Sequence, residues 1–137
     1  MYRLFLVFTL ISLACCREKQ SKLFEEVKYL AELEGLGEAV LIQYGEEDGF
    51  LEPLMTYGLF SIDSVDFEKL LNAVRNNENF KAGSYYLNVE LDAYLSKNEL
   101  EILNMSNSLI TRNKYDNTYY LYLLSDNKSF AICKVNH

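Results

Sequence analysis

The spacing of hydrophobic residues changes along this chain, and each spacing predicts a type of element. Apolar residues recur every three or four positions after Ser21 and again after Asp63 or Ser64, with charged residues on the opposite side. This spacing is typical of amphipathic helices, and Ser and Asp are typical N-cap residues. The sequence therefore predicts two helices, the first ended at Gly35 and the second at Asn76.

Three further segments in the first two thirds of the chain have the patterns of strands. Residues 39–44 are almost all apolar, which is typical of a largely buried strand. Residues 85–91 alternate strictly between apolar and polar, which predicts a half-buried strand. Residues 55–61 follow Pro53 and contain Gly58, so we expect an edge strand there.

The segment from Leu95 to Leu100 carries two signals of a helix N-terminus. Ser96 and Glu99 have the spacing of a capping box, in which each side chain bonds the other residue's backbone N–H. Leu95 and Leu100 have the spacing of the hydrophobic staple that accompanies such a cap. The sequence therefore predicts a third, short helix that begins at Ser96 and runs through Leu103.

The last third of the chain reads as consecutive strands over residues 108–112, 118–125 and 129–135. The short polar turn between the last two favours an antiparallel hairpin. Strands that follow one another directly predict the α+β class. We expect a mainly antiparallel sheet of about five to six strands, with two to three helices packed on one face. All of this fits one domain over residues 21–137.

The run from Tyr119 to Leu124 is apolar at every position, so a strand formed by it is apolar on both faces. One interpretation is a central strand covered on both sides, paired with residues 129–135, in which Cys133 is a small buried side chain. The other is an exposed recognition face rich in tyrosine, which is enriched at protein interfaces. Tyr86, Tyr115 and Tyr119 are the candidate binding residues of such a face.

The first residues have a different pattern. After Arg3, every position from Leu4 to Ala14 is apolar or a small hydroxyl residue, and a polar segment follows Cys15 and Cys16. The apolar run has the length of a signal-peptide hydrophobic region. It is shorter than the roughly 20 residues that a membrane-spanning helix needs. We therefore expect a leader that directs export.

The junction Ser12-Leu13-Ala14-Cys15-Cys16 resembles the signal of bacterial lipoproteins, in which a cysteine is acylated and becomes the new N-terminus. Cys15 as the acceptor places the expected small residue, Ala14, directly before it. Cys16 as the acceptor instead places Leu13 where the family has leucine. The resemblance implies a signal peptide over residues 1–15, a short tether over 16–20 and a lipid-anchored protein of the bacterial cell envelope.

Charge and chemistry narrow the function of the domain. The chain carries 20 acidic and 13 basic residues, a net charge of −7, so we expect no nucleic-acid partner but allow a basic protein partner. The only histidine is the last residue, His137, and no zinc or phosphate-binding motif is present. We therefore predict no catalytic residues, no metal site and no cofactor. Cys133 is either unpaired or joined to Cys16.

Together these features predict a small acidic envelope lipoprotein that is not an enzyme. Its expected contacts are the lipid bilayer, through the N-terminal acyl anchor, and a protein that it binds, for instance as an inhibitor or an immunity protein. The alternatives are a structural or assembly accessory of the envelope and a lipoprotein that binds a sugar or lipid.

Overall fold

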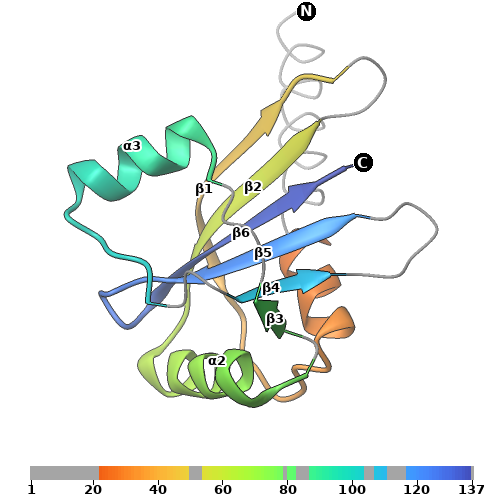
Figure 1. Ribbon diagram of the computed structural model, residues 1–137. Helices are drawn as coiled ribbons and strands as arrows, with labels where there is room; N and C mark the ends of the chain where they lie inside the picture. The colour runs from red at the N-terminus through yellow and green to blue at the C-terminus, as the bar shows by residue number, and fades with distance from the viewer. Residues whose placement is uncertain are drawn as a thin grey trace, which may run out of the picture.

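The centre of the structure is a six-stranded sheet in which every neighbouring pair of strands is antiparallel (Figure 1). The computed structural model describes residues 22–49, 54–78, 80–82, 87–103, 107–110 and 117–136. Across the sheet the strands are β1 (Val40–Glu47), β2 (Met55–Ser61), β6 (Ser129–Val135), β5 (Thr118–Leu123), β4 (Asn107–Ile110) and β3 (Phe80–Ala82). The predicted α+β class and the antiparallel hairpin of the last two strands are confirmed.

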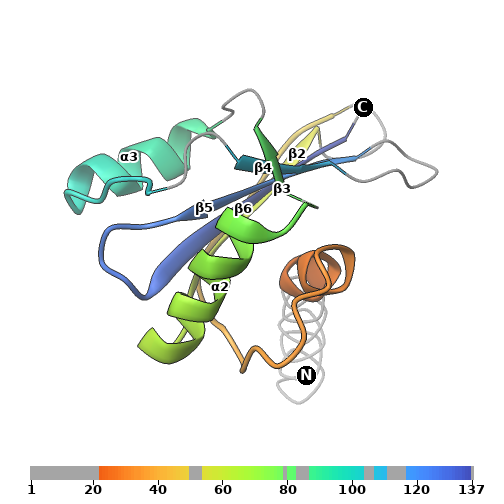
Figure 2. The same cartoon turned by 60° about the horizontal axis from the view of Figure 1, so that its bottom comes forward.

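Helices cover both faces of this sheet (Figure 2). A helix over residues 22–30 and helix α2 (Ser64–Asn76) lie on one face, and helix α3 (Val89–Lys97) lies on the other. The prediction that all helices pack on one face is therefore wrong for α3. The reason is that β5 and β6 are apolar on both sides, and a single layer of helices buries only one of them.

The two faces of β5 and β6 belong to two separate hydrophobic cores. Leu121, Leu123 and Phe130 pack with the helix over residues 22–30 and with α2, whereas Tyr122 and Ala131 pack with α3. Burial of one large apolar side chain stabilises a fold by about 1.5–3 kcal/mol. The interpretation of residues 119–124 as a central strand covered on both sides is confirmed by this arrangement.

Cys133 lies in the α3-side core and forms no disulfide. Its side chain is fully buried, as the sequence predicted for a small apolar residue of this strand. Burial raises the pKa of the thiol to about 12, so it stays protonated at neutral pH. Cys16, the other candidate for pairing, lies outside the described residues.

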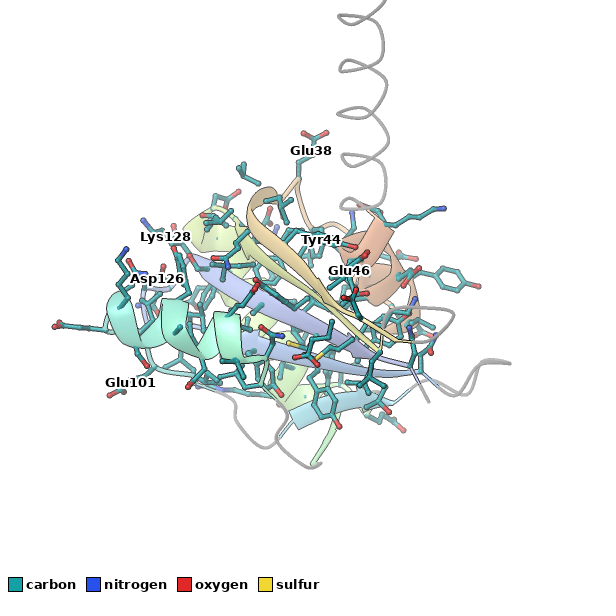
Figure 3. All side chains as sticks on the ribbon, turned by 90° about the horizontal axis from the view of Figure 1, so that it is seen from above. Glu38, Tyr44, Glu46, Glu101, Asp126 and Lys128 are labelled. Carbon is teal, nitrogen blue, oxygen red and sulfur yellow. The ribbon has the colours of Figure 1, made fainter. Side chains whose placement is uncertain are left out.

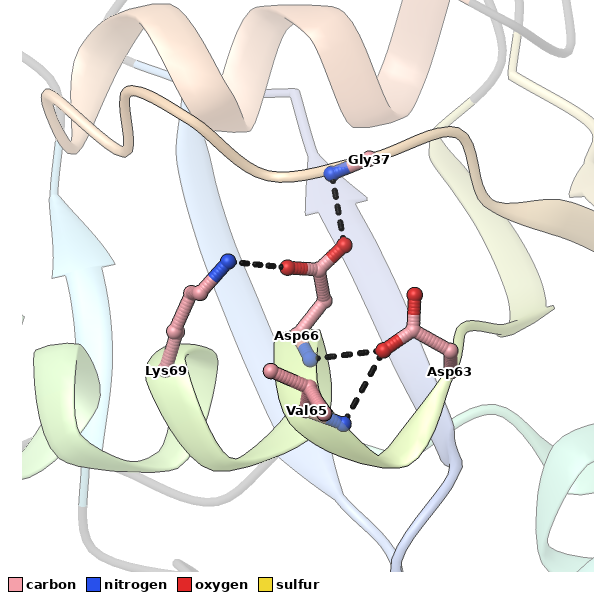
Figure 4. A network of polar contacts seen from close by, with 5 residues as sticks. All are labelled: Gly37, Asp63, Val65, Asp66 and Lys69. Carbon is pink, nitrogen blue, oxygen red and sulfur yellow. Dashed lines mark hydrogen bonds and ion pairs between the residues drawn. The ribbon is translucent and has the colours of Figure 1, made fainter.

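Helix α2 begins where the sequence places it and is tied to the segment before β1 (Figure 4). The Asp63 carboxylate accepts hydrogen bonds from the backbone N–H groups of Val65 and Asp66 and so caps the helix. The buried Asp66 carboxylate accepts from Lys69 Nζ at 2.6 Å and from the Gly37 backbone N–H at 2.8 Å. These contacts lower the pKa of Asp66, the Lys69 hydrogen bond most strongly and the Gly37 bond next.

The predicted positions of β1 and β2 in the sheet are reversed in the structure. The segment expected to be largely buried, β1, is an edge of the sheet, where Val40 is 68 % exposed and Ile42 lies at an irregularity in the pairing. The expected edge strand, β2, lies between β1 and β6. Gly58 does not weaken β2. Its missing side chain leaves room for the Phe60 ring, which a Cβ at Gly58 would approach to 2.6 Å.

Helix α3 begins at Val89, inside the segment of residues 85–91 for which the sequence predicted a strand, so that prediction is wrong for Val89–Leu91. The Asn88 side chain accepts hydrogen bonds from the N–H groups of Glu90 and Leu91 and caps the helix. Leu91 and Leu95 then lie one turn apart and are both buried against the sheet. The alternation seen over residues 85–91 was too short to distinguish a strand from a helix that begins inside it.

The segment from Leu95 to Leu100 ends a helix and does not begin one, so the predicted helix from Ser96 to Leu103 is wrong. Leu100 N–H donates to the Leu95 carbonyl at 2.9 Å, and Glu99 N–H donates to the Ser96 carbonyl at 3.3 Å. Glu99 has a positive φ of 54°. These are the bonds and the backbone conformation of a Schellman motif.

The helix over residues 22–30 ends in the same way, before the predicted stop at Gly35. Leu33 N–H donates to the Lys28 carbonyl at 2.9 Å, and Glu32 N–H donates to the Tyr29 carbonyl at 3.3 Å. Glu32, with a φ of 53°, takes the left-handed position. Ser21, the predicted N-cap of this helix, lies outside the described residues.

We predict that Glu99→Gly increases stability, because glycine adopts a positive φ without the steric cost that glutamate has. The expected gain in the free energy of unfolding is about 0.5–1 kcal/mol, measured by urea denaturation. Ser96→Ala is the matched variant and should change stability by less than about 0.5 kcal/mol. A loss of about 1 kcal/mol in Ser96→Ala, without a gain in Glu99→Gly, would instead indicate a capping box.

The lowered pKa of Asp66 predicts a pH-dependent contribution to stability. A carboxylate whose pKa is lower in the folded state stabilises the fold above its unfolded pKa of about 4, and this stabilisation is lost as the pH falls through the folded value. Asp66→Asn should therefore lower the urea midpoint at pH 7 and have little effect near pH 2. Glu68→Gln, an exposed neighbour on α2, serves as control. An equal effect of Asp66→Asn at both pH values would contradict this account.

Candidate functional site

Tyr119, one of the three tyrosines predicted to form the binding face, is buried in the structure. Tyr119 is 1 % exposed, and its hydroxyl donates a hydrogen bond to the Glu26 carboxylate at 2.6 Å. Lys134 Nζ donates to the same carboxylate at 3.2 Å and lies 5.5 Å from the centre of the Tyr119 ring. Tyr119 therefore fastens the helix over residues 22–30 to the sheet, and its assignment to an exposed face is wrong.

The environment of Tyr119 also keeps its hydroxyl protonated. Burial first, and then the hydrogen bond to Glu26, raise the pKa of Tyr119 well above its usual value. The other predicted site residues, Tyr86 and Tyr115 of the binding face and Cys15 and Cys16 of the lipid anchor, lie outside the described residues. Those assignments stay predictions.

A polar cluster that sequence reasoning missed lies where β1 meets the N-terminus of α3. Tyr57 is buried, and its hydroxyl accepts a hydrogen bond from Gln43 Nε2 at 2.8 Å and donates one to Glu90 at 2.7 Å. The side chain passes over Gly45, where a Cβ would lie 2.2 Å from the Tyr57 ring. Burial and the Glu90 hydrogen bond raise the pKa of Tyr57 to about 12.

Asn88 extends this cluster. Its side-chain amide donates to Glu47 at 2.6 Å, while its carbonyl oxygen caps α3. Asn88 is buried, and among the described residues no buried side-chain nitrogen or oxygen lacks a partner. The cluster thus joins β1, β2 and the start of α3 through hydrogen bonds to carboxylates, which are about twice as strong as neutral ones. It fixes the position of α3 on the sheet.

The properties of the cluster are those of a structural element. Cys133, whose pKa is affected by Asn88 and Glu47, is buried and protonated, so it is a poor nucleophile. Among the described residues no group of His, Cys, Asp or Glu is arranged to hold a metal ion. Glu47 accepts a hydrogen bond from Asn88, and Glu90 accepts one from Tyr57. These bonds from neutral donors fix the positions of the two carboxylates.

A surface hollow of about 490 Å³ lies at the other end of α3. Its apolar lining consists of Leu95, Leu100 and Ile102, which the core on this side of the sheet includes. Its polar lining includes the exposed acidic residues Asp92, Glu99 and Glu101, together with Ser96. Figure 3 shows Glu101 beside α3, pointing away from the sheet.

Backbone contacts set the shape of this hollow. The Schellman motif turns the chain back at the end of α3, and Ile102 then pairs with Leu124 at the end of β5. Glu101 N–H donates to Ser125 Oγ at 3.0 Å, and Ser125 N–H donates to the Glu101 carbonyl at 2.9 Å. The backbone that carries Glu99 and Glu101 is therefore fixed relative to α3.

Comparison of the chain with models of protein families, with curated proteins and with solved structures gives no match. Within the part of the chain that the structure describes, none of the helices combines the length and the apolar character needed to cross a bilayer.

Proposed function

We propose that this chain is a small acidic lipoprotein of a bacterial envelope, anchored by an acyl group on Cys15 or Cys16, that binds another protein and catalyses no reaction. The apolar leader and the cysteine pair support the anchor. A single acyl chain gives only marginal membrane binding, and the lipoprotein class that the leader resembles carries more than one.

The position of the helix over residues 22–30 supports one orientation of the proposed anchored domain. The helix over residues 22–30 follows the expected tether of residues 16–20 directly. Two contacts hold that helix to the sheet. The centres of the Phe24 and Phe130 rings lie 5.2 Å apart, and Glu26 accepts a hydrogen bond from Tyr119. The anchor would therefore hold this face of the sheet toward the bilayer.

The opposite face is the one that α3 covers, and it is the face we assign to the partner (Figure 2). Four of its exposed residues are acidic: Glu90 and Asp92 lie on α3, and Glu99 and Glu101 follow it. Lys97 is the only basic residue within α3. Exposed acidic residues such as Glu25, Glu34 and Glu68 also lie elsewhere on the domain. The observation that carries the proposal is that the acidic residues on and after α3 lie on the side away from the tethered helix, where a partner can reach them.

A basic protein is the partner that such a surface fits. Opposite charges speed the encounter of two proteins and favour the correct orientation, and salt weakens both effects. Blocking a basic enzyme or toxin is one activity of this kind. The net charge of −7 gives the whole chain a field of the same sign.

The proposed function is tested by isolating the affinity-tagged chain from detergent-solubilised envelopes of its own bacterium. We predict that a basic protein is recovered with it at about 50 mM salt and is lost at about 500 mM. The reason is that the Debye length falls from ~14 Å to ~4 Å between these salt concentrations. Mass spectrometry identifies the partner. A tagged unrelated lipoprotein of similar size is the control. Recovery of no specific protein at either salt concentration would contradict the proposed function.

A further inference from the structure

We propose that the hollow at the end of α3 receives an arginine side chain of the protein partner. This inference rests on the proposed function, because it assigns the point of contact to one part of the acidic surface. The lining of the hollow combines the apolar residues Leu95, Leu100 and Ile102 with the acidic residues Asp92, Glu99 and Glu101. Both features are needed by a side chain that has an apolar stem and a charged end.

Among the described residues, no ion pair includes a carboxylate of the hollow. The ion pairs between described residues join Lys28 to Glu25, Lys69 to Asp66 and Lys134 to Glu26, and none of them includes Asp92, Glu99 or Glu101. Like charges that share a small region repel one another, so a bound cation relieves this repulsion as well as forming new contacts.

The helix itself adds to the attraction for a cation. The hollow adjoins the C-terminal end of α3, which is the negative end of the helix dipole. Asp92 precedes Leu95 by three residues and Ser96 by four, so these three side chains lie on one side of α3. Glu99 lies just beyond the helix end.

Arginine fits this arrangement better than lysine. Its planar guanidinium presents several N–H donors that can bond two carboxylates at once, and it loses less hydration than an ammonium group. Arginine is also enriched among the residues that dominate binding energy at interfaces. A volume of about 490 Å³ admits such a side chain together with part of a neighbouring apolar residue of the partner.

The test compares two variants of the full anchored chain that lose the same number of charges. In the hollow variant, Asp92→Asn, Glu99→Gln and Glu101→Gln are combined. In the control variant, Glu34→Gln, Glu38→Gln and Glu68→Gln remove exposed carboxylates that do not line the hollow. Circular dichroism and thermal unfolding confirm that both variants are folded. Binding to the protein recovered by the wild-type chain is then measured at low salt.

We expect the hollow variant to bind the recovered partner at least about tenfold more weakly, and the control variant to bind within about twofold of the wild-type chain. Replacing the contacting arginine of the partner by lysine should weaken binding to the wild-type chain but not to the hollow variant. Equal weakening of both variants, or of neither, would overturn the assignment to the hollow while leaving the proposed function intact.

If the wild-type chain recovers no partner, the proposed function fails, and a direct probe decides the inference about the hollow. N-acetyl-arginine amide is titrated into the isotope-labelled chain in detergent, and its neutral isostere, N-acetyl-citrulline amide, is the control. Saturable shifts of the amide signals of residues 92–102 with the arginine probe alone, lost in the hollow variant, support the inference. No shifts, or the same shifts with both probes, overturn it.

Discussion

Strands β5 and β6 place large apolar side chains on both of their faces, and this requirement for burial determines the arrangement of the other elements. Successive residues of a strand point to opposite sides, so Leu121 and Leu123 face one core while Tyr122 faces the other. The helix over residues 22–30 and α2 cover the first face, and α3 covers the second. Two layers of helix are thus a consequence of one hairpin sequence.

The division into two faces also separates the two roles that we assign to the domain. The helix that follows the expected tether packs on one face, where Glu26 joins it to Tyr119 and Lys134. The acidic hollow lies at the end of the helix on the other face. A protein held at a bilayer by its N-terminus can meet a partner most easily with the side that points away from the membrane.

Sequence patterns predicted the elements that contain a complete local signal. Helix α2 has both its N-cap, Asp63, and a full apolar stripe, and strands β5 and β6 contain the apolar runs of residues 119–123 and 130–133. The order of the strands in the sheet was harder to predict from the sequence. Whether β1 or β2 forms the edge depends on which strand pairs with β6, a contact between residues 68 to 80 positions apart.

The sequence patterns around helix α3 led to wrong predictions because they fit more than one structure. Leu95 and Leu100 are five residues apart, and this spacing occurs both in the hydrophobic staple that begins a helix and in the contact that accompanies a Schellman motif at its end. Only the residues before Leu95 decide between the two, and there the Asn88 cap was hidden within an alternating pattern. The hollow depends on this turn, so the sequence alone did not indicate it.

Mass spectrometry of the native protein, purified from the membranes of its own bacterium, tests the claim on which the proposed role depends. The account predicts a polypeptide that begins at Cys15 or Cys16, with a diacylglycerol thioether on that cysteine and with the leader removed. A native polypeptide that still begins at Met1, or that begins downstream with an unmodified cysteine, would contradict it.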